Sequence, residues 1–267
     1  MRILVILLGL AVLLVVSGVW YWTHHKIYRF DNEPARAEGL NGIRRVLFQA
    51  TDGTELRAFV ADPAPDAPVL ISFYGNFSGV IPSLQRLQPL MDAGIGIVML
   101  EYRGSGDAPG TPSERALHAD ALALYDQLDD LLGRPVPTDR RFIHGYSLGV
   151  SPAVALASQR AAAGLVIEAG YDRLCRFQET RLRGFPMCRL MWAERHDVVE
   201  RAGQIAMPVL MAHGARDTDV PQVWAEPLFN ALPQPKRLVV FPEGTHTNLI
   251  AQGLDKQVLG FLADPTL

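Results

Sequence analysis

Beyond residue 40, apolar and polar positions follow two periodic patterns. Residues 46–50 and 56–60 alternate on either side of Thr51-Asp52-Gly53, which predicts a hairpin at a sheet edge. Farther on, short apolar runs alternate with longer stretches of helical spacing, so we expect an α/β fold, a mostly parallel sheet flanked by helices on both faces. The expected strands are 69–73, 95–100, the run ending at His144, 165–169, 207–212 and 236–241, and the expected helices are 81–92, 113–132, 150–163, 222–232 and one ending at Leu262.

The N-terminus forms a separate hydrophobic block. Residues 3–22 carry no charged side chain, and about 20 apolar residues suffice to cross a bilayer as a helix. The block closes with Trp20-Tyr21-Trp22, as is typical of a membrane interface. We therefore expect residues 1–26 to be a single membrane anchor and residues 27–267 to form one domain.

A cleaved signal peptide is the alternative interpretation of this block. Residues 3–16 would then be its apolar region, and Ser17-Gly18 would lie near the cut. Either interpretation carries the domain across the membrane, so we expect an extracytoplasmic domain, or secretion after cleavage. Arg2 before the block and Lys26 and Arg29 after it give no decisive orientation.

The pentapeptide Gly145-Tyr146-Ser147-Leu148-Gly149 stands between an expected strand and an expected helix. A sharp turn there forces its middle residue into a strained conformation, and the flanking glycines remove Cβ atoms that would collide with strand and helix. Ser147 is thus predicted to project at the apex as a nucleophile. A glycine-punctuated strand end is the plainer interpretation of the same pattern.

A nucleophilic serine needs a base, and the base needs an orienting carboxylate. In a nucleophile-elbow fold the acid and then the histidine follow the serine, each on a loop after a strand. The strand 207–212 is followed by Asp217, and the strand 236–241 by His246. We predict Asp217 as the acid and His246 as the base, with Asp219 as the rival acid.

Stabilisation of an oxyanion requires two backbone N–H groups, one from the residue after the nucleophile and one from the loop after an earlier strand. Leu148 is the first expected donor. In the loop after strand 69–73, Gly75 allows a close turn, and Asn76 is the second expected donor, with Phe77 next.

With these residues in place, the chain from about residue 30 onward resembles the α/β-hydrolase family, particularly small membrane-tethered serine hydrolases related to protein depalmitoylases, lysophospholipases and monoacylglycerol lipases. The resemblance rests on the motifs Tyr74-Gly75-Asn76, Tyr102-Arg103-Gly104-Ser105-Gly106, Gly145-Tyr146-Ser147-Leu148-Gly149, His213-Gly214-Ala215-Arg216-Asp217 with Val220-Pro221, and Gly244-Thr245-His246. Where the family carries His-Gly and a small residue, this chain has Tyr74-Gly75 and Phe77, which bears on substrate preference.

Composition narrows the possible functions. The chain has 267 residues, is 49% hydrophobic and carries a net charge of −3, so it can bury one large core and has little electrostatic support for nucleic-acid binding. No zinc, phosphate-loop or dinucleotide motif is found, and the expected chemistry needs no metal or organic cofactor. We interpret the remaining domain histidines as structural: His118, His144, His196 and His213.

Residues 171–204 form a connection too long for a simple loop, and we predict a small cap over the site. Arginines alternate there with apolar and aromatic side chains, which would suit an acyl chain with an anionic head group or a membrane surface, although acidic residues offset much of the charge. Cys175 and Cys188, the only cysteines, both fall in this segment and could form one bridge or remain free thiols.

We therefore predict a serine hydrolase that cleaves carboxylic esters or thioesters of acyl or lipid-like substrates through an acyl-enzyme. Its expected partners are that substrate and, through the N-terminal helix, the membrane. A serine peptidase or aminopeptidase on the same fold and a non-catalytic binding domain are the alternatives. The sequence leaves the native substrate and the oligomeric state open.

Overall fold

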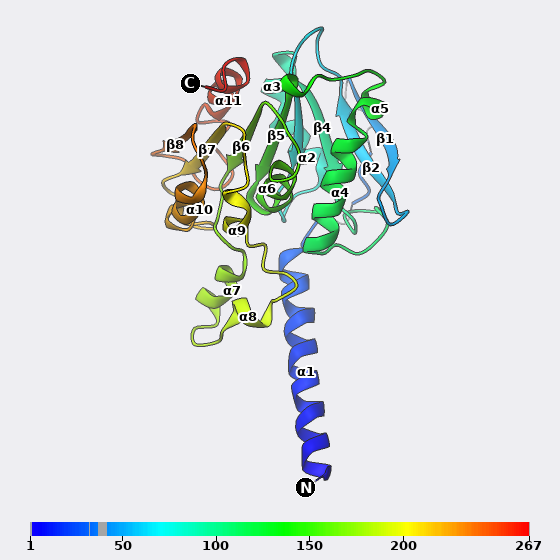
Figure 1. Ribbon diagram of the computed structural model, residues 1–267, viewed down its shortest axis with the longest axis vertical. Coiled ribbons are helices and arrows are strands. Elements are labelled where there is room, and N and C mark those ends of the chain that lie inside the picture. Colours follow the sequence, from blue (N-terminus) through cyan, green and yellow to red (C-terminus); the bar gives the residue numbers. More distant parts are fainter. Residues whose placement is uncertain (1, 32, 37–41, 267) are drawn as a thin grey trace.

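An eight-stranded sheet organises the domain, with strand order β1-β2-β4-β3-β5-β6-β7-β8 (Figure 1). The computed structural model describes residues 2–31, 33–36 and 42–266. All strand pairs are parallel except the two that involve β2. The strands are β1 Ile43–Gln49, β2 Glu55–Ala61, β3 Val69–Phe73, β4 Gly96–Glu101, β5 Arg141–Tyr146, β6 Gly164–Glu168, β7 Val209–Gly214 and β8 Lys236–Phe241.

Helices flank this sheet, which confirms the predicted α/β architecture. In Figure 1, α4 and α6 lie in front of the sheet, where they pack against each other. The helices are α1 Arg2–Ile27, α2 Val80–Arg86, α3 Gln88–Asp92, α4 Glu114–Asp126, α5 Leu128–Leu132, α6 Val150–Ala157, α7 Cys175–Arg181, α8 Met187–Leu190, α9 Val199–Ala202, α10 Glu226–Ala231 and α11 Leu254–Ala263.

The strands lie close to the positions that the sequence pattern predicts. The hairpin of β1 and β2 forms the edge of the sheet, as predicted, and its turn contains Gly53 at a φ of 81°. Strands β3, β4, β6 and β7 are buried along their whole length. Such burial on both faces is expected for parallel strands and explains their continuous apolar runs.

Several expected helices are shorter than predicted. The expected helix 81–92 divides at Leu87 into α2 and α3, and 113–132 divides at Gln127 into α4 and α5. The expected helix 150–163 ends at Ala157. The expected helix 222–232 begins as the 3₁₀ turn Gln222–Trp224 and continues as α10. Hydrophobic spacing continues across such short breaks, so periodicity alone misses them.

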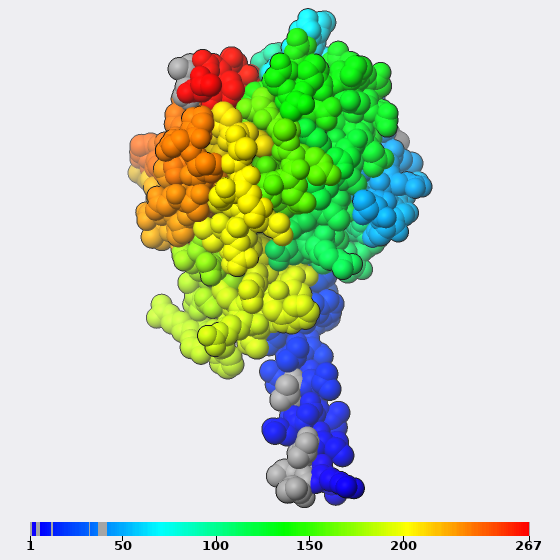
Figure 2. Space-filling view, viewed as in Figure 1, coloured from blue at the N-terminus to red at the C-terminus, as the bar shows by residue number. Residues whose placement is uncertain are grey.

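Helix α1 extends away from the domain, and the segment Ile6–Ile27 is apolar enough to span a membrane, with a mean hydropathy of 2.0 (Figures 1 and 2). Its last turns belong to the domain instead. Thr23 and Ile27 are buried, and a ring nitrogen of His24 lies 2.9 Å from the carbonyl oxygen of Pro112. We call residues 23–29 the anchor base.

Residues 171–204, the segment for which we predict a cap and which we call the cap below, carry α7, α8 and α9. Cys175 and Cys188 form a disulfide that joins α7 to α8, which answers a question the sequence left open. Helices α7 and α8 lie at the same end of the domain as the anchor base (Figures 1 and 2).

Candidate active site

The turn between β5 and α6 has the strained geometry that the pentapeptide predicts. Ser147 has a φ of 52°, in the left-handed region that non-glycine residues rarely occupy. The turn also depends on the two glycines. A Cβ on Gly149 would lie 2.1 Å from the carbonyl oxygen of Phe73, and one on Gly145 would lie 2.6 Å from that of Gly149. Close packing of strand, turn and helix therefore excludes any larger residue.

The structure brings the three predicted catalytic side chains into one chain of hydrogen bonds. Ser147 Oγ lies 3.0 Å from His246 Nε2, and His246 Nδ1 lies 2.8 Å from Asp217 Oδ2. The three residues follow β5, β8 and β7 respectively, so the carboxyl ends of neighbouring strands bring together residues that are distant in sequence.

Asp217, and not Asp219, lies in hydrogen-bond contact with the predicted base His246. The Asp217 side chain is buried, and its Oδ1 accepts hydrogen bonds from the backbone N–H groups of Asp219 at 3.0 Å and Val220 at 2.8 Å. These bonds fix the carboxylate toward His246. The Asp219 side chain is exposed and has no such partners among the described residues.

Two neighbours hold the imidazole and its loop in place, and neither was predicted to do so. Tyr146 donates a hydrogen bond of 3.0 Å to the carbonyl oxygen of His246. A ring nitrogen of His213 lies 2.8 Å from the carbonyl oxygen of Val220, beneath the acid loop. Burial lowers the pKa of His213, which favours its neutral form and agrees with its structural interpretation.

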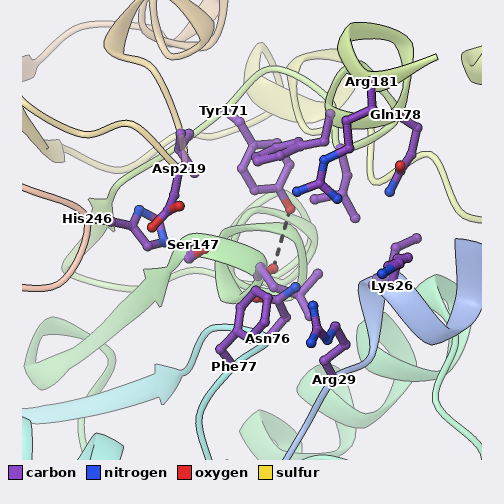
Figure 3. A pocket seen from close by; sticks show the side chains of 15 residues that line it. Lys26, Arg29, Asn76, Phe77, Ser147, Tyr171, Gln178, Arg181, Asp219 and His246 are labelled. Atoms are coloured by element: carbon purple, nitrogen blue, oxygen red, sulfur yellow. Dashed lines mark hydrogen bonds between the residues drawn. The ribbon is translucent and has the colours of Figure 1, made fainter.

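The loop after β3 passes directly over the nucleophile. A Cβ on Gly75 would lie 3.2 Å from that of Ser147. Asn76 follows, and among the described residues its backbone N–H has no acceptor. Leu148, the other expected donor, is buried, and its carbonyl oxygen accepts a long hydrogen bond of 3.5 Å from the Tyr171 hydroxyl, drawn as the dashed line in Figure 3. Both candidate donors thus border the nucleophile.

Two cavities share Ser147 in their lining, and Figure 3 shows the first of them. One, of about 110 Å³, lies beneath the cap and also reaches the anchor base; we call it the anchor–cap cavity. The other, of about 520 Å³, extends along the loop after β3. Residues that line the anchor–cap cavity include Lys26, Ile27, Arg29, Asn76, Phe77, Leu174, Phe177, Gln178 and Arg181.

Sequence reasoning missed the contribution of the anchor base to this cavity. Lys26 and Arg29 were considered only as charges that flank a membrane segment, and Ile27 only as the start of the domain. No local pattern could have predicted that these residues line the cavity. The Arg29 guanidinium carbon, for example, lies 4.6 Å from the ring centre of Phe77, which is distant in sequence. Such long-range contacts carry no periodic signal.

A buried network outside the site connects the anchor base to the cap and the core. The Tyr28 hydroxyl donates to the Glu194 carboxylate and lies 2.9 Å from His196 Nε2. The Ser151 hydroxyl in turn lies 2.8 Å from His196 Nδ1 and 2.8 Å from His118 Nε2. Burial, with His196 close by, lowers the pKa of His118 to about 3, so His118 acts as a neutral structural group.

Two groups of described side chains are close enough to hold a metal ion: Glu114 with His118 and His196, and Asp217 with Asp219 and His246. In both groups, histidine ring nitrogens already take part in hydrogen bonds within the protein. His196 and His118 face Ser151, and His246 Nδ1 faces Asp217. In both groups, hydrogen bonds within the protein therefore compete with a metal ion for histidine nitrogens.

Comparison with known proteins supports this architecture. No family model matches the chain. The uncharacterized Mycobacterium tuberculosis protein Rv2307c is 31% identical over 246 residues, which cover 89% of this chain and 86% of that protein. The lysophosphatidylserine lipase ABHD12 of Danio rerio is 26% identical over 249 residues, which cover 79% of this chain and 64% of the lipase.

Among solved structures, an esterase from Pyrococcus furiosus aligns with a TM-score of 0.69 at 17% identity, covering 87% of this chain and 98% of the esterase. Together these proteins place the chain in the α/β-hydrolase class of fold. Within that class, the chain belongs to the same family as the mycobacterial protein.

Proposed function

We propose that the protein is a serine hydrolase that cleaves acyl esters or thioesters of lipid-like substrates through an acyl-enzyme. The observation that carries the proposal is the hydrogen-bond chain from Ser147 through His246 to Asp217, in an α/β hydrolase of the esterase type. The strained position of Ser147 at the turn apex, which opens onto both cavities, adds support.

In the proposed mechanism, Ser147 Oγ attacks the acyl carbonyl carbon while His246 Nε2 takes the hydroxyl proton. Asp217 orients the imidazole and stabilises its charged form. The backbone N–H groups of Asn76 and Leu148 bind the developing oxyanion. His246 then returns the proton to the departing alcohol or thiol, and a water molecule activated by His246 releases the free acid.

The lipid-like character of the substrate rests on two observations. The relative from Danio rerio is named a lysophosphatidylserine lipase, so a related chain acts on a single-chain lipid. In this protein, the catalytic cavity is lined partly by apolar side chains of the cap, Leu174 and Phe177, and opens beside a helix long and apolar enough to enter a bilayer. A depalmitoylase-like or monoacylglycerol-lipase-like preference stays a prediction.

We propose further that α1 is a single-pass anchor and that the domain lies on the extracytoplasmic side. Helix α1 runs without a break through Ser17-Gly18, the alternative cleavage point, into the anchor base, where Thr23 and Ile27 are buried. The Cys175–Cys188 disulfide favours an oxidising compartment for the cap.

The deciding experiment compares the full-length protein with its Ser147→Ala variant in detergent or nanodiscs. We expect wild type to react with a fluorophosphonate probe and to hydrolyse acyl esters, and the variant to lose labelling and about 10³-fold or more in kcat while keeping its melting temperature. Near-normal ester hydrolysis by the purified variant would refute the serine mechanism. Faster cleavage of aminoacyl amides than of esters would favour a peptidase instead.

A further inference from the structure

The two ends of the anchor–cap cavity differ in charge. Lys26 and Arg29 come from the anchor base and Arg181 from α7 of the cap, and all three line the cavity. In Figure 3 they lie on the side away from His246 and Asp219. We call these three residues the cationic wall. Asp219 is the only carboxylate among the cavity residues, and it lies at the opposite, catalytic end.

The cationic wall has no internal counter-ion among the described residues. None of its three side chains takes part in an ion pair, although many other arginines of the domain do. Arg29 instead stacks on Phe77, next to the candidate oxyanion donor Asn76. Three cations around one cavity repel each other, and an anion between them would offset that repulsion.

A second, independent observation points to a ligand with hydrogen-bonding groups in the same cavity. Gln178 lines it from α7 and is only 4% exposed, yet its Oε1 has no hydrogen-bond partner. A buried amide oxygen without a partner costs roughly 1–3 kcal/mol, so such groups are nearly always satisfied. A hydroxyl or ammonium group of a ligand in the cavity would satisfy it.

We propose that this cavity binds the anionic head group of the substrate, a phosphate or carboxylate, against Lys26, Arg29 and Arg181, while the acyl carbonyl lies at Ser147. The inference rests on the proposed hydrolase function and specifies its substrate class: single-chain acyl esters with an anionic head group. It also makes the end of the membrane anchor part of the specificity site. Gln178 Oε1 accepts a hydrogen bond from a head-group hydroxyl or ammonium.

The test uses the full-length protein in nanodiscs of zwitterionic phosphatidylcholine. Its substrates are two water-soluble esters with the same acyl chain, hexanoylglycerol phosphate and hexanoylglycerol. Short chains keep both esters monomeric, so attraction to an anionic membrane does not contribute. We expect wild type to prefer the phosphate ester in kcat/KM. Each of Lys26→Gln, Arg29→Gln and Arg181→Gln should reduce only that rate, by about two- to fivefold for one exposed cation.

Two further variants sharpen the comparison. Gln178→Glu keeps the side-chain shape but adds a negative charge at the cavity, so it should also reduce turnover of the phosphate ester selectively. Arg183→Gln is the matched control, because Arg183 is an exposed arginine of the cap outside the cavity lining. It should leave both rates unchanged. Added salt should weaken the wild-type preference, since exposed charges are screened.

Hydrolysis of hexanoylglycerol by wild type separates this proposal from the proposed function. If wild type cleaves neither ester, the hydrolase assignment fails. If it cleaves the neutral ester but the variants slow both esters equally, or neither, the anionic head-group site is wrong. An effect of the variants that appears only with long-chain substrate in anionic vesicles would overturn it too, because the cations would then bind the membrane surface.

Discussion

At the scale of single residues, the two aspartates after β7 offer the sharpest test of the site. Asp217→Asn should lower kcat by about 10⁴-fold, because the amide cannot hold His246 in the productive tautomer. Asp219→Asn should change kcat by less than roughly fivefold, since it alters only an exposed charge near the site. Ester kinetics on both purified variants, with melting temperatures as the folding control, measure the difference. Equal losses would remove Asp217 from the acid position.

His144 makes the stability of the fold depend on pH. It is buried in β5, its Nδ1 lies 2.9 Å from the Ser72 hydroxyl, and burial, with Arg86 nearby, lowers its pKa to about 3. In the unfolded chain a histidine titrates near pH 6.5, so between about pH 6.5 and 3 only the unfolded state binds this proton. The contribution of His144 to the free energy of unfolding therefore falls as the pH falls through that window.

We expect His144→Gln to lose less stability than wild type between pH 7.5 and pH 5. Urea unfolding followed by circular dichroism at both values gives the two changes in free energy. Any difference in stability between variant and wild type at pH 7.5 itself does not bear on the comparison, which concerns only the change with pH. Parallel changes in wild type and variant would show that His144 does not carry the dependence.

At the scale of elements, the cap disulfide constrains the segment of the cap that lines the anchor–cap cavity. Cys175 and Cys188 are 13 residues apart, and the bridged segment contains Phe177, Gln178 and Arg181 of the cavity lining. Closing a loop of about 15 residues contributes about 3 kcal/mol in the chain-entropy model. The bridge thus holds the part of the cavity wall that α7 contributes in position.

Replacing both cysteines by serine should loosen α7 and α8, so that the backbone after the already exposed Arg181 and Arg183 fits more readily into the active site of trypsin. We expect faster cleavage at these arginines, detected by mass spectrometry, together with a loss of catalytic efficiency. Wild type treated with reductant should resemble the variant, and untreated wild type is the control. Identical cleavage patterns in all three samples would mean that the bridge does not hold the cap.

The elements also show what the sequence could and could not predict. Strands and the elbow were predicted correctly because buried parallel strands and a glycine-flanked turn each leave a local pattern. Helix breaks at Leu87 and Gln127 left none, because the apolar spacing continues across them. The approach of Ser147, His246 and Asp217 followed from chain order in a parallel sheet, but the position of Arg29 over Phe77 depends on packing across the chain and could not be predicted.

At the scale of the whole molecule, the apolar surface of the cap and α1 face the same side. Trp192 and Phe185 are 72% and 62% exposed in the cap, and a groove of about 490 Å³ separates the Trp192 region from Trp20 and Tyr21 of α1. Figure 2 shows the cap and α1 at one end of the molecule. We therefore expect the tip of the cap to contact the bilayer into which α1 inserts.

Trp192→Ser should reduce hydrolysis of long-chain esters embedded in vesicles and leave soluble short-chain esters unaffected, because only the former require the cap at the bilayer. Leu47→Ser is a suitable control, since Leu47 is 52% exposed on β1 at the edge of the sheet. Rates on both substrate forms measure the effect. A loss on soluble esters as well would indicate damage to the cavity and not to membrane contact.

Helix α1 ends at Ile27, which itself lines the anchor–cap cavity, so under the proposed anchoring no flexible spacer would separate the bilayer from Ser147. Each molecule would then reach only substrate in the leaflet next to its domain. Turnover would therefore follow the amount of substrate per membrane area more closely than its bulk concentration. Proteolytic shedding at the anchor base would remove part of the wall along with the tether. The released fragment would be a catalyst with a different selectivity.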